Sequence, residues 1–168
     1  MVRHLDGHPS LTVKTPTTAE LILRRREERR LLAGHLWVYA NEVDTARTPL
    51  SALSPGQKVS ILSHQGRWIG GGYANPHSLI CARLVSRDRD HPFDASLITH
   101  RINVALGLRD RLYDRPFYRL IYGESDGLPG LVVDRYGDLA VVQISTAGME
   151  IGSKSANRST ITRPVFAS

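Results

Sequence analysis

The feature that most constrains the fold is a series of short apolar runs within residues 118–145, separated by strong turn signals. Three runs have the length and the apolar character of strands: Tyr118–Tyr122, Leu131–Arg135 and Leu139–Ser145. Between them stand residue pairs that favour tight turns: Asp126-Gly127, Pro129-Gly130 and Gly137-Asp138. The pattern predicts three antiparallel strands joined by short loops, a β-meander.

A helix is predicted just before the meander. Apolar residues recur every three or four positions within residues 94–113, which places them on one helical face. Asp94 is a suitable N-cap, because its carboxylate can accept a hydrogen bond from a backbone N–H of the first turn. The charged, proline-containing stretch 86–93 is predicted to be a linker.

The first half of the chain predicts a small barrel. Three strand candidates follow one another at about 10-residue spacing: Lys58–Leu62, Arg67–Tyr73 and Leu79–Val85. Residues 21–23 and 37–39 add two shorter strands, and residues 24–32 are predicted to form a helix that ends at Gly34. Gly70-Gly71-Gly72 would permit a sharp bend at a barrel corner, or a close approach to phosphate.

Composition narrows the class of protein. The chain has 168 residues, 41% of them hydrophobic, and a formal net charge of +6. Only three of its 22 basic residues are lysines. Guanidinium groups pair with phosphate and stack on bases, which favours a nucleic-acid partner, although an arginine-rich codon preference would give the same count.

Several other classes of protein are not indicated. Cys81 is the only cysteine, so neither an intrachain disulfide nor a cysteine zinc cluster can form. The seven histidines are scattered, without a helical metal-binding pair. No apolar stretch is long enough to span a membrane, and no signal-peptide pattern is present. We therefore expect a cytoplasmic protein with no membrane partner.

Three segments carry a resemblance to a known family: GHLWVYANEV (34–43), GQKVSILSHQGRWIGGGYANPHSLICARLV (56–85) and YRLIYGESDGLPGLVVDRYGD (118–138). They resemble the N-terminal part of the S-adenosylmethionine-dependent 23S ribosomal RNA cytosine-5 methyltransferases that begin with a PUA domain. The resemblance implies an α+β chain, a PUA-like small β-barrel followed by a helix and β-meander. It also implies RNA, in particular large-subunit ribosomal RNA, as the partner.

The resemblance divides the chain into four parts. We expect a flexible leader over residues 1–18, a PUA-like RNA-binding domain over 19–90, and a linking unit of helix and meander over 94–148. Residues 149–168 do not resemble the family and are expected to be a disordered tail. We expect one face of the meander to be exposed or covered by a second copy, which would give a homodimer.

Candidate RNA-binding residues come from the basic cluster and from the motifs of the family: Arg24, Arg25, Arg26, Arg29, His35, Trp37, Tyr73, Asn75 and Arg83. The arginine cluster could neutralise phosphates, or be a solvated helix face balanced by Glu27 and Glu28. Trp37 could stack on an unpaired base or close the barrel core. Arg83 could face RNA or cover the core with its aliphatic stem.

No catalytic, cofactor-binding or metal-binding residue is predicted. Glu124, Asp126, Asp134 and Asp138 lie mostly at turns with no paired base or nucleophile, and Cys81 stands mid-strand between apolar neighbours. S-adenosylmethionine is implied for the full-length family, but its glycine-rich donor loop has no counterpart here. Two hypotheses remain: an RNA-binding fragment of a methyltransferase, inactive alone, or a truncated, frameshifted product with no function of its own.

Overall fold

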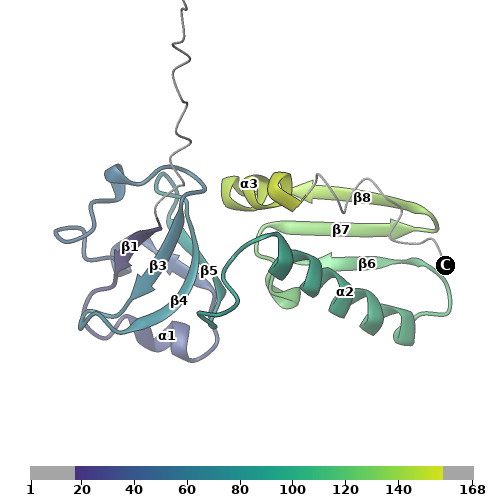
Figure 1. Cartoon of the computed structure of the whole chain (residues 1–168), viewed down its shortest axis with the longest axis horizontal. Helices are drawn as coiled ribbons and strands as arrows, with labels where there is room; N and C mark the ends of the chain where they lie inside the picture. Colours follow the sequence, from purple (N-terminus) through teal and green to yellow (C-terminus); the bar gives the residue numbers. More distant parts are fainter. Residues whose placement is uncertain (1–17, 157–168) are drawn as a thin grey trace, which may run out of the picture.

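The computed structural model describes residues 18–156, which form two units joined by a short linker (Figure 1). The first unit contains strands β1 to β5, and the second contains helix α2, strands β6 to β8 and helix α3. The mixed α+β class is therefore confirmed. The expected flexible leader lies, apart from Thr18, outside the described residues.

The first unit is built on one curved five-stranded sheet with the order β1-β3-β4-β5-β2. Its strands are β1 (Ala19–Ile22), β2 (Trp37–Tyr39), β3 (Lys58–Leu62), β4 (Trp68–Ala74) and β5 (Ile80–Ser86). Strands β1 and β3 pair in parallel, and the other neighbours are antiparallel. Its core is formed by apolar residues that include Leu23, Val38 and Ile61, none of which is exposed.

This sheet is not a closed barrel, although a barrel was expected. Among the described residues, its two edge strands do not pair with each other, and one isolated bridge, between Leu23 after β1 and Val43 after β2, links the two sides. Two further backbone hydrogen bonds flank that bridge, from Arg24 N to Glu42 O at 2.8 Å and from Asp44 N to Ile22 O at 2.9 Å. The edge strands have four and three residues, so they are too short to form a continuous closing ladder.

Helix α1 is shorter than predicted and spans Glu28–Leu32, whereas residues 24–32 were expected to be helical. The bonds made by Arg24 explain the difference, because its backbone N–H donates to Glu42 and its Nε donates to the carbonyl of Val43 at 3.1 Å. Residues 25–27 then form a turn in which Arg26 has a φ of 73°, in the left-handed region. A non-local contact thus displaces the start of the helix.

The glycine run in β4 serves the packing of the sheet. A Cβ on Gly72 would lie 1.9 Å from the carbonyl oxygen of Arg83 in β5, which excludes any side chain there. The register between β4 and β5 also shifts between Gly71 and Gly72, as at a bulge. Of the two roles considered for the run, the structure bears out the bend.

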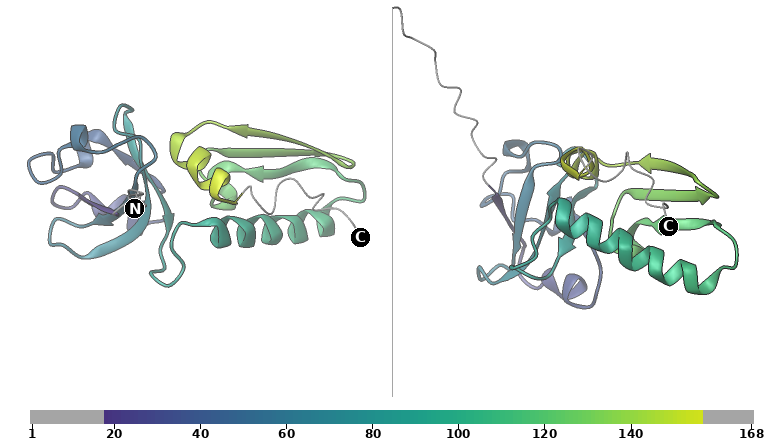
Figure 2. Two further views of the ribbon diagram at one scale, coloured as in Figure 1. Left: turned by 45° about the horizontal axis from the view of Figure 1, so that its top comes forward. Right: turned by 45° about the vertical axis from the view of Figure 1, so that its right-hand side comes forward.

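The second unit consists of the predicted helix and meander, followed by a further helix. Its elements are α2 (Ala95–Leu112), β6 (Phe117–Tyr122), β7 (Leu131–Tyr136), β8 (Leu139–Ile144) and α3 (Ala147–Ala156). The carboxylate of Asp94 accepts a hydrogen bond from Leu97 N at 2.9 Å and caps α2 as expected. Helix α2 lies on one face of the three-stranded sheet (Figure 2).

Tyr73 connects the two units. It lies in β4 but belongs to the core of the second unit, where it is fully buried and its ring centroid is 5.5 Å from that of Phe93. Its hydroxyl donates to the carbonyl of Pro129 at 2.7 Å and lies 2.9 Å from Thr146 Oγ1. Burial raises the pKa of Tyr73 to about 12, so the hydroxyl stays protonated at neutral pH.

Helix α3 corrects the expectation of a disordered tail from residue 149. Met149 is fully buried, and a Cβ on Gly148 would lie 2.0 Å from the ring of Tyr73. Gly56 in the first unit sits against Ala147 and Ile151. The prediction is therefore wrong for residues 149–156, because small residues let the helix pack against both units. Residues 157–168 lie outside the described part.

Within residues 18–156, no helix combines the length and apolar character that crossing a bilayer requires.

Replacing Tyr73 by Phe should lower the free energy of unfolding by about 1–3 kcal/mol, because the buried carbonyl of Pro129 loses its donor. Urea unfolding followed by circular dichroism measures the change. Tyr136→Phe is the matched control, since Tyr136 is 52% exposed and should change stability by less than about 0.5 kcal/mol. Equal effects of the two variants would contradict the bridging role of Tyr73.

Candidate nucleic-acid interface

The arginine turn, which we define as Arg24, Arg25, Arg26 and Arg29, lies on the surface of the first unit. Arg24 is held by its bond to Val43. In residues 18–156, the other three make no ion pair, and neither Glu27 nor Glu28 pairs with them. Arg25, Arg26 and Arg29 are solvent-exposed beside Glu27 and Glu28, so phosphate binding and a solvated helix face both stay predictions for this cluster.

Arg30, next to this turn, behaves differently. Its Nη1 lies 2.5 Å from Glu42 Oε1, and its guanidinium stacks over the ring of Tyr39 at 4.9 Å. The hydrogen bond to Glu42 is the main reason why the pKa of Arg30 is raised. Because Glu42 is paired with Arg30, its carboxylate forms no ion pair with the arginine turn.

Trp37 and His35 follow α1 and face solvent. Trp37 is 37% exposed, so it does not close the core as the alternative interpretation held. Its Nε1 donates to Glu124 Oε1 at 2.7 Å, which ties the first unit to the 3-10 turn Gly123–Asp126 of the second. The carbonyl of His35 accepts a hydrogen bond from Arg87 Nη2 at 3.0 Å.

The other three candidates have different surroundings. Tyr73 is fully buried in the contact between the units, so its prediction as an RNA-contacting residue is wrong. Asn75 is half-buried at the start of the β4–β5 turn, where its backbone bonds to Cys81 and Ser78. Arg83 stands opposite Trp37 and Tyr73 in the sheet. Its Nε and Nη1 are buried without a hydrogen-bond partner among the described residues.

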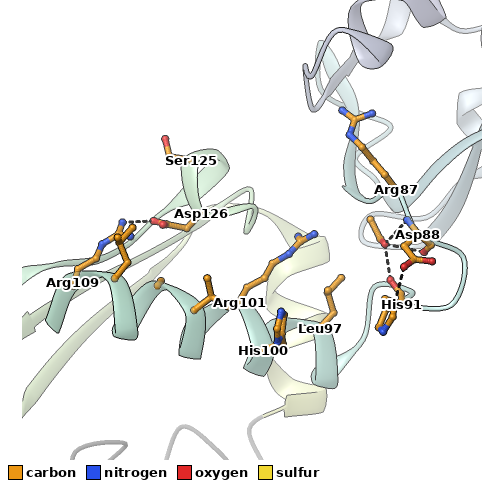
Figure 3. A pocket seen from close by; sticks show the side chains of 13 residues that line it. Arg87, Asp88, His91, Leu97, His100, Arg101, Arg109, Ser125 and Asp126 are labelled. Carbon is orange, nitrogen blue, oxygen red and sulfur yellow. Dashed lines mark hydrogen bonds and ion pairs between the residues drawn. The ribbon is translucent and has the colours of Figure 1, made fainter. Parts of the chain in front are cut away.

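A groove of about 650 Å³ lies between the linker after β5, helix α2 and the 3-10 turn (Figure 3). The linker and α2 provide its basic side chains: Arg87, His91, His100, Arg101 and Arg109. Its floor includes the apolar side chains of Leu97, Val104 and Leu108. Arg87 lines this groove and also donates a hydrogen bond to the carbonyl of His35.

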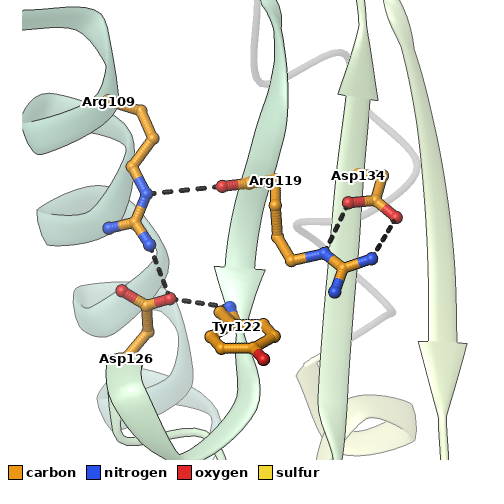
Figure 4. A network of polar contacts seen from close by, with 5 residues as sticks. All are labelled: Arg109, Arg119, Tyr122, Asp126 and Asp134. Carbon is orange, nitrogen blue, oxygen red and sulfur yellow. Dashed lines mark hydrogen bonds and ion pairs between the residues drawn. The ribbon is translucent and has the colours of Figure 1, made fainter. Parts of the chain in front are cut away.

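The charges of the groove are only partly compensated. Arg109 Nη2 lies 2.8 Å from Asp126 Oδ2, which also accepts from Tyr122 N at 2.7 Å (Figure 4). Arg101 instead donates to two carbonyls, of Val85 at 2.7 Å and of Gly127. Burial lowers the pKa of Arg101, yet a guanidinium remains charged at neutral pH. Arg87 and Arg101 therefore leave positive charge in the groove.

His91 and Asp88 form an exposed pair at the rim, with Nδ1 and Oδ2 2.8 Å apart. The hydrogen bond to Asp88 raises the pKa of His91, and the same bond lowers the pKa of Asp88. The imidazole is consequently protonated to a higher pH than an isolated histidine.

The described residues contain no group of three or more metal-ligating side chains. The Cys81 thiol is fully buried, and burial raises its pKa to about 11, so it is a poor nucleophile. Asp134 is bound by both Nε and Nη2 of Arg119, at 2.8 and 3.0 Å (Figure 4). Asp126 and Asp134 thus serve as structural partners of arginines.

Sequence reasoning missed the groove. Arg87 and His91 lie in the stretch predicted to be a linker, and Arg101 and Arg109 lie in the segment predicted to be a helix. The runs of arginine and histidine in both segments were the available signal. Their convergence depends on how the linker turns back on α2, which no local pattern indicates.

Replacing Asp88 by Asn should lower the pKa of His91 toward its ordinary value, because the charged hydrogen-bond acceptor is lost. An NMR titration of the imidazole protons measures the change, with His100 as the internal control. The protonated state of His91 would then be lost at lower pH than in the unaltered chain. An unchanged His91 titration would show that the pair does not form in solution.

Known proteins are similar to this chain in sequence. Residues 21–87 match the family described as PUA-like domain. Ribosomal RNA large subunit methyltransferase I of Salmonella arizonae is 38% identical over 138 residues, and that of Erwinia tasmaniensis is 40% identical over 136 residues. The alignments cover 80% and 79% of this chain and 34% of each relative. The chain thus spans about a third of the length of these curated relatives.

Solved structures share the arrangement of both units. A protein from Streptococcus mutans, described as a candidate SAM-dependent methyltransferase, superposes with a TM-score of 0.68 at 15% identity. A second structure, described as a candidate methyltransferase complexed with SAH, gives a TM-score of 0.69 at 15% identity. In both cases the similarity covers 83% of this chain and 36% of the other chain. At this identity the likeness concerns the fold alone.

Proposed function

We propose that this chain, a homologue of the N-terminal part of ribosomal RNA large subunit methyltransferase I with a PUA-like domain, binds RNA. The observation that carries the proposal is the arginine turn, in which Arg25, Arg26 and Arg29 are exposed and form no ion pair among residues 18–156. Exposed guanidinium groups are suited to phosphate, which they can bind through two parallel hydrogen bonds.

Trp37 gives this surface a means of contacting bases. Its partly exposed indole can stack on an unpaired base, a contact that tolerates every sequence because each base has a π-face. Its edge stays fixed by the bond to Glu124, so the ring is held in place before RNA arrives. Arg83, whose inner nitrogens lack partners, lies in the neighbouring strand.

The groove extends the proposed path of the RNA. Arg87 and Arg101 form no ion pair with a carboxylate of residues 18–156 and supply positive charge, and Val104 and Leu108 supply apolar surface. A single strand fits such a groove better than a duplex, because its bases can leave the stack and contact apolar side chains.

The finer parts of the proposal concern the reaction. We propose large-subunit ribosomal RNA as the partner and the cytoplasm as the place of action. The chemistry served would be methyl transfer from S-adenosylmethionine to carbon 5 of a cytosine, with the cofactor held by a catalytic part of the protein. The residues described here would position RNA and take no part in the chemistry. The alternative, a truncated and frameshifted chain with no function of its own, predicts no RNA binding.

Changing Arg25 and Arg29 to Glu should weaken binding to a labelled fragment of large-subunit ribosomal RNA by at least about tenfold at moderate salt. The slope of log affinity against log salt should fall by about 1.4, since each single-strand phosphate contact contributes about 0.7. Fluorescence anisotropy across a salt series measures both quantities. The charge-matched control is Arg111→Glu with Arg115→Glu, at the far end of α2.

The control pair should leave most of the affinity intact, although both double variants change the net charge equally. If the two double variants weaken binding to the same extent, general charge and not the arginine turn governs binding. Binding of the unaltered chain that does not change with salt would contradict the proposal itself.

Trp37→Ala should cost about 1–3 kcal/mol of RNA-binding free energy, because one stacked base is lost. Trp37→Phe keeps an aromatic face but removes the N–H that bonds to Glu124, and it should retain most of the affinity. Titration with RNA that has an unpaired loop measures both. Similar losses in the two variants would mean that the link to Glu124, and not stacking, accounts for the role of Trp37.

A further inference from the structure

Among residues 18–156, strand β8 forms one edge of the three-stranded sheet. It is the last strand of the order β6-β7-β8, and all six of its residues are exposed. Its sequence, LAVVQI, has no charge and no proline, the usual features that protect an edge from pairing with another chain. The opposite edge, β6, follows Pro116, carries Arg119 and has an irregular register near that residue. Among residues 18–156, no strand covers the outer side of β8.

The hydrogen-bond register identifies which backbone groups point outward. Ser145 N donates to Gly130 O at 2.9 Å, one position beyond the pair Leu131–Ile144. Hydrogen-bonded positions alternate along an antiparallel pair, so the odd-numbered residues of β8 bond to β7. The N–H and C=O groups of the even-numbered residues therefore face away from the sheet: Ala140, Val142 and Ile144.

We propose that β8 pairs antiparallel with β8 of a second copy of the chain, about a twofold axis at Val142. Both strands then show the same sheet face, as a twofold axis perpendicular to a sheet requires. Val142 stands opposite Val142 of the second copy, and Ala140 stands opposite Ile144. The result is a continuous six-stranded sheet in which all three outward-facing residues of each copy gain hydrogen-bond partners.

The side chains at this seam suit a second copy. Ala140, Val142 and Ile144 lie on the sheet face of Leu131 and Val133, so pairing extends an apolar surface that already packs on α2. On the other face, Val141 would stand opposite Gln143. No charged side chain of the strand meets its own copy, which avoids like-charge repulsion across the axis.

The strand chemistry favours protein over RNA as the partner here. Strand β8 has no arginine or lysine to bind phosphate, whereas its exposed aliphatic side chains and outward backbone groups match another β-strand. The surface is separate from the arginine turn and the groove, so the pairing does not depend on the proposed RNA binding.

Val142→Lys tests the pairing, because two lysines would meet at the twofold axis. Light scattering of the 168-residue chain over a concentration series should show a dimer whose dissociation constant rises more than about tenfold in this variant. Phe117→Lys is the matched control, since Phe117 is an apolar residue of the opposite edge strand and 63% exposed. Its dimerisation should be unchanged.

A strictly monomeric unaltered chain at the highest soluble concentration would overturn the proposal. So would a dimer that Phe117→Lys disrupts and Val142→Lys does not. RNA affinity and circular dichroism of Val142→Lys, expected to match the unaltered chain, establish that the variant is folded.

Disulfide formation tests the register itself. In a Cys81→Ala background, Val142→Cys should give a cross-linked dimer under mild oxidation, because hydrogen-bonded partners have Cα atoms about 5.5 Å apart, within the range of a disulfide. Val141→Cys should cross-link much more slowly, since its opposite residue is Gln143. Equal cross-linking of the two variants would overturn the assignment of the axis to Val142.

Discussion

The burial of Tyr73 in the second unit is the contact on which the rest of the structure depends. A β4 residue of one sheet places its ring in the core of another unit, and its hydroxyl bonds to the loop before β7 and to Thr146. Gly148 leaves room for that ring, and Gly56 leaves room for α3 in turn. Because an unsatisfied buried hydroxyl or carbonyl is costly, these hydrogen bonds permit few relative positions of the two units.

The groove is a consequence of that fixed relation. Arg101 of α2 donates to the carbonyl of Val85 in the first unit and to that of Gly127 in the second. Trp37 of the first unit donates to Glu124 of the second. The bond to Val85 holds the end of β5, where the linker begins, beside α2, and Arg87 of the linker and Arg101 and Arg109 of the helix line one groove. A looser connection would leave the same residues on the surface without a common cavity.

The meander and α2 could be predicted because their signals are local: turn pairs, strand-length apolar runs and an N-cap. The start of α1 could not, because Arg24 bonds to residues on the far side of the sheet. The burial of Tyr73, which was predicted to contact RNA, could not be foreseen for a similar reason. Alternation in a strand tells which residues share a face, but the second unit covers the face of Tyr73 and leaves part of Trp37 exposed. The amino-acid composition does not show how the second unit packs on the first.

The distribution of paired and unpaired arginines separates structural from binding roles. Arg30, Arg109 and Arg119 each form an ion pair with a carboxylate. These pairs lie beside Tyr39, at the 3-10 turn and in the meander, respectively. Within residues 18–156, the arginine turn and Arg87 form no ion pair with a carboxylate. Exposed ion pairs add little stability, so a fold gains little by pairing every surface arginine. Arginines left unpaired on the surface keep a charge that a polyanion can neutralise, with counterion release as the driving term.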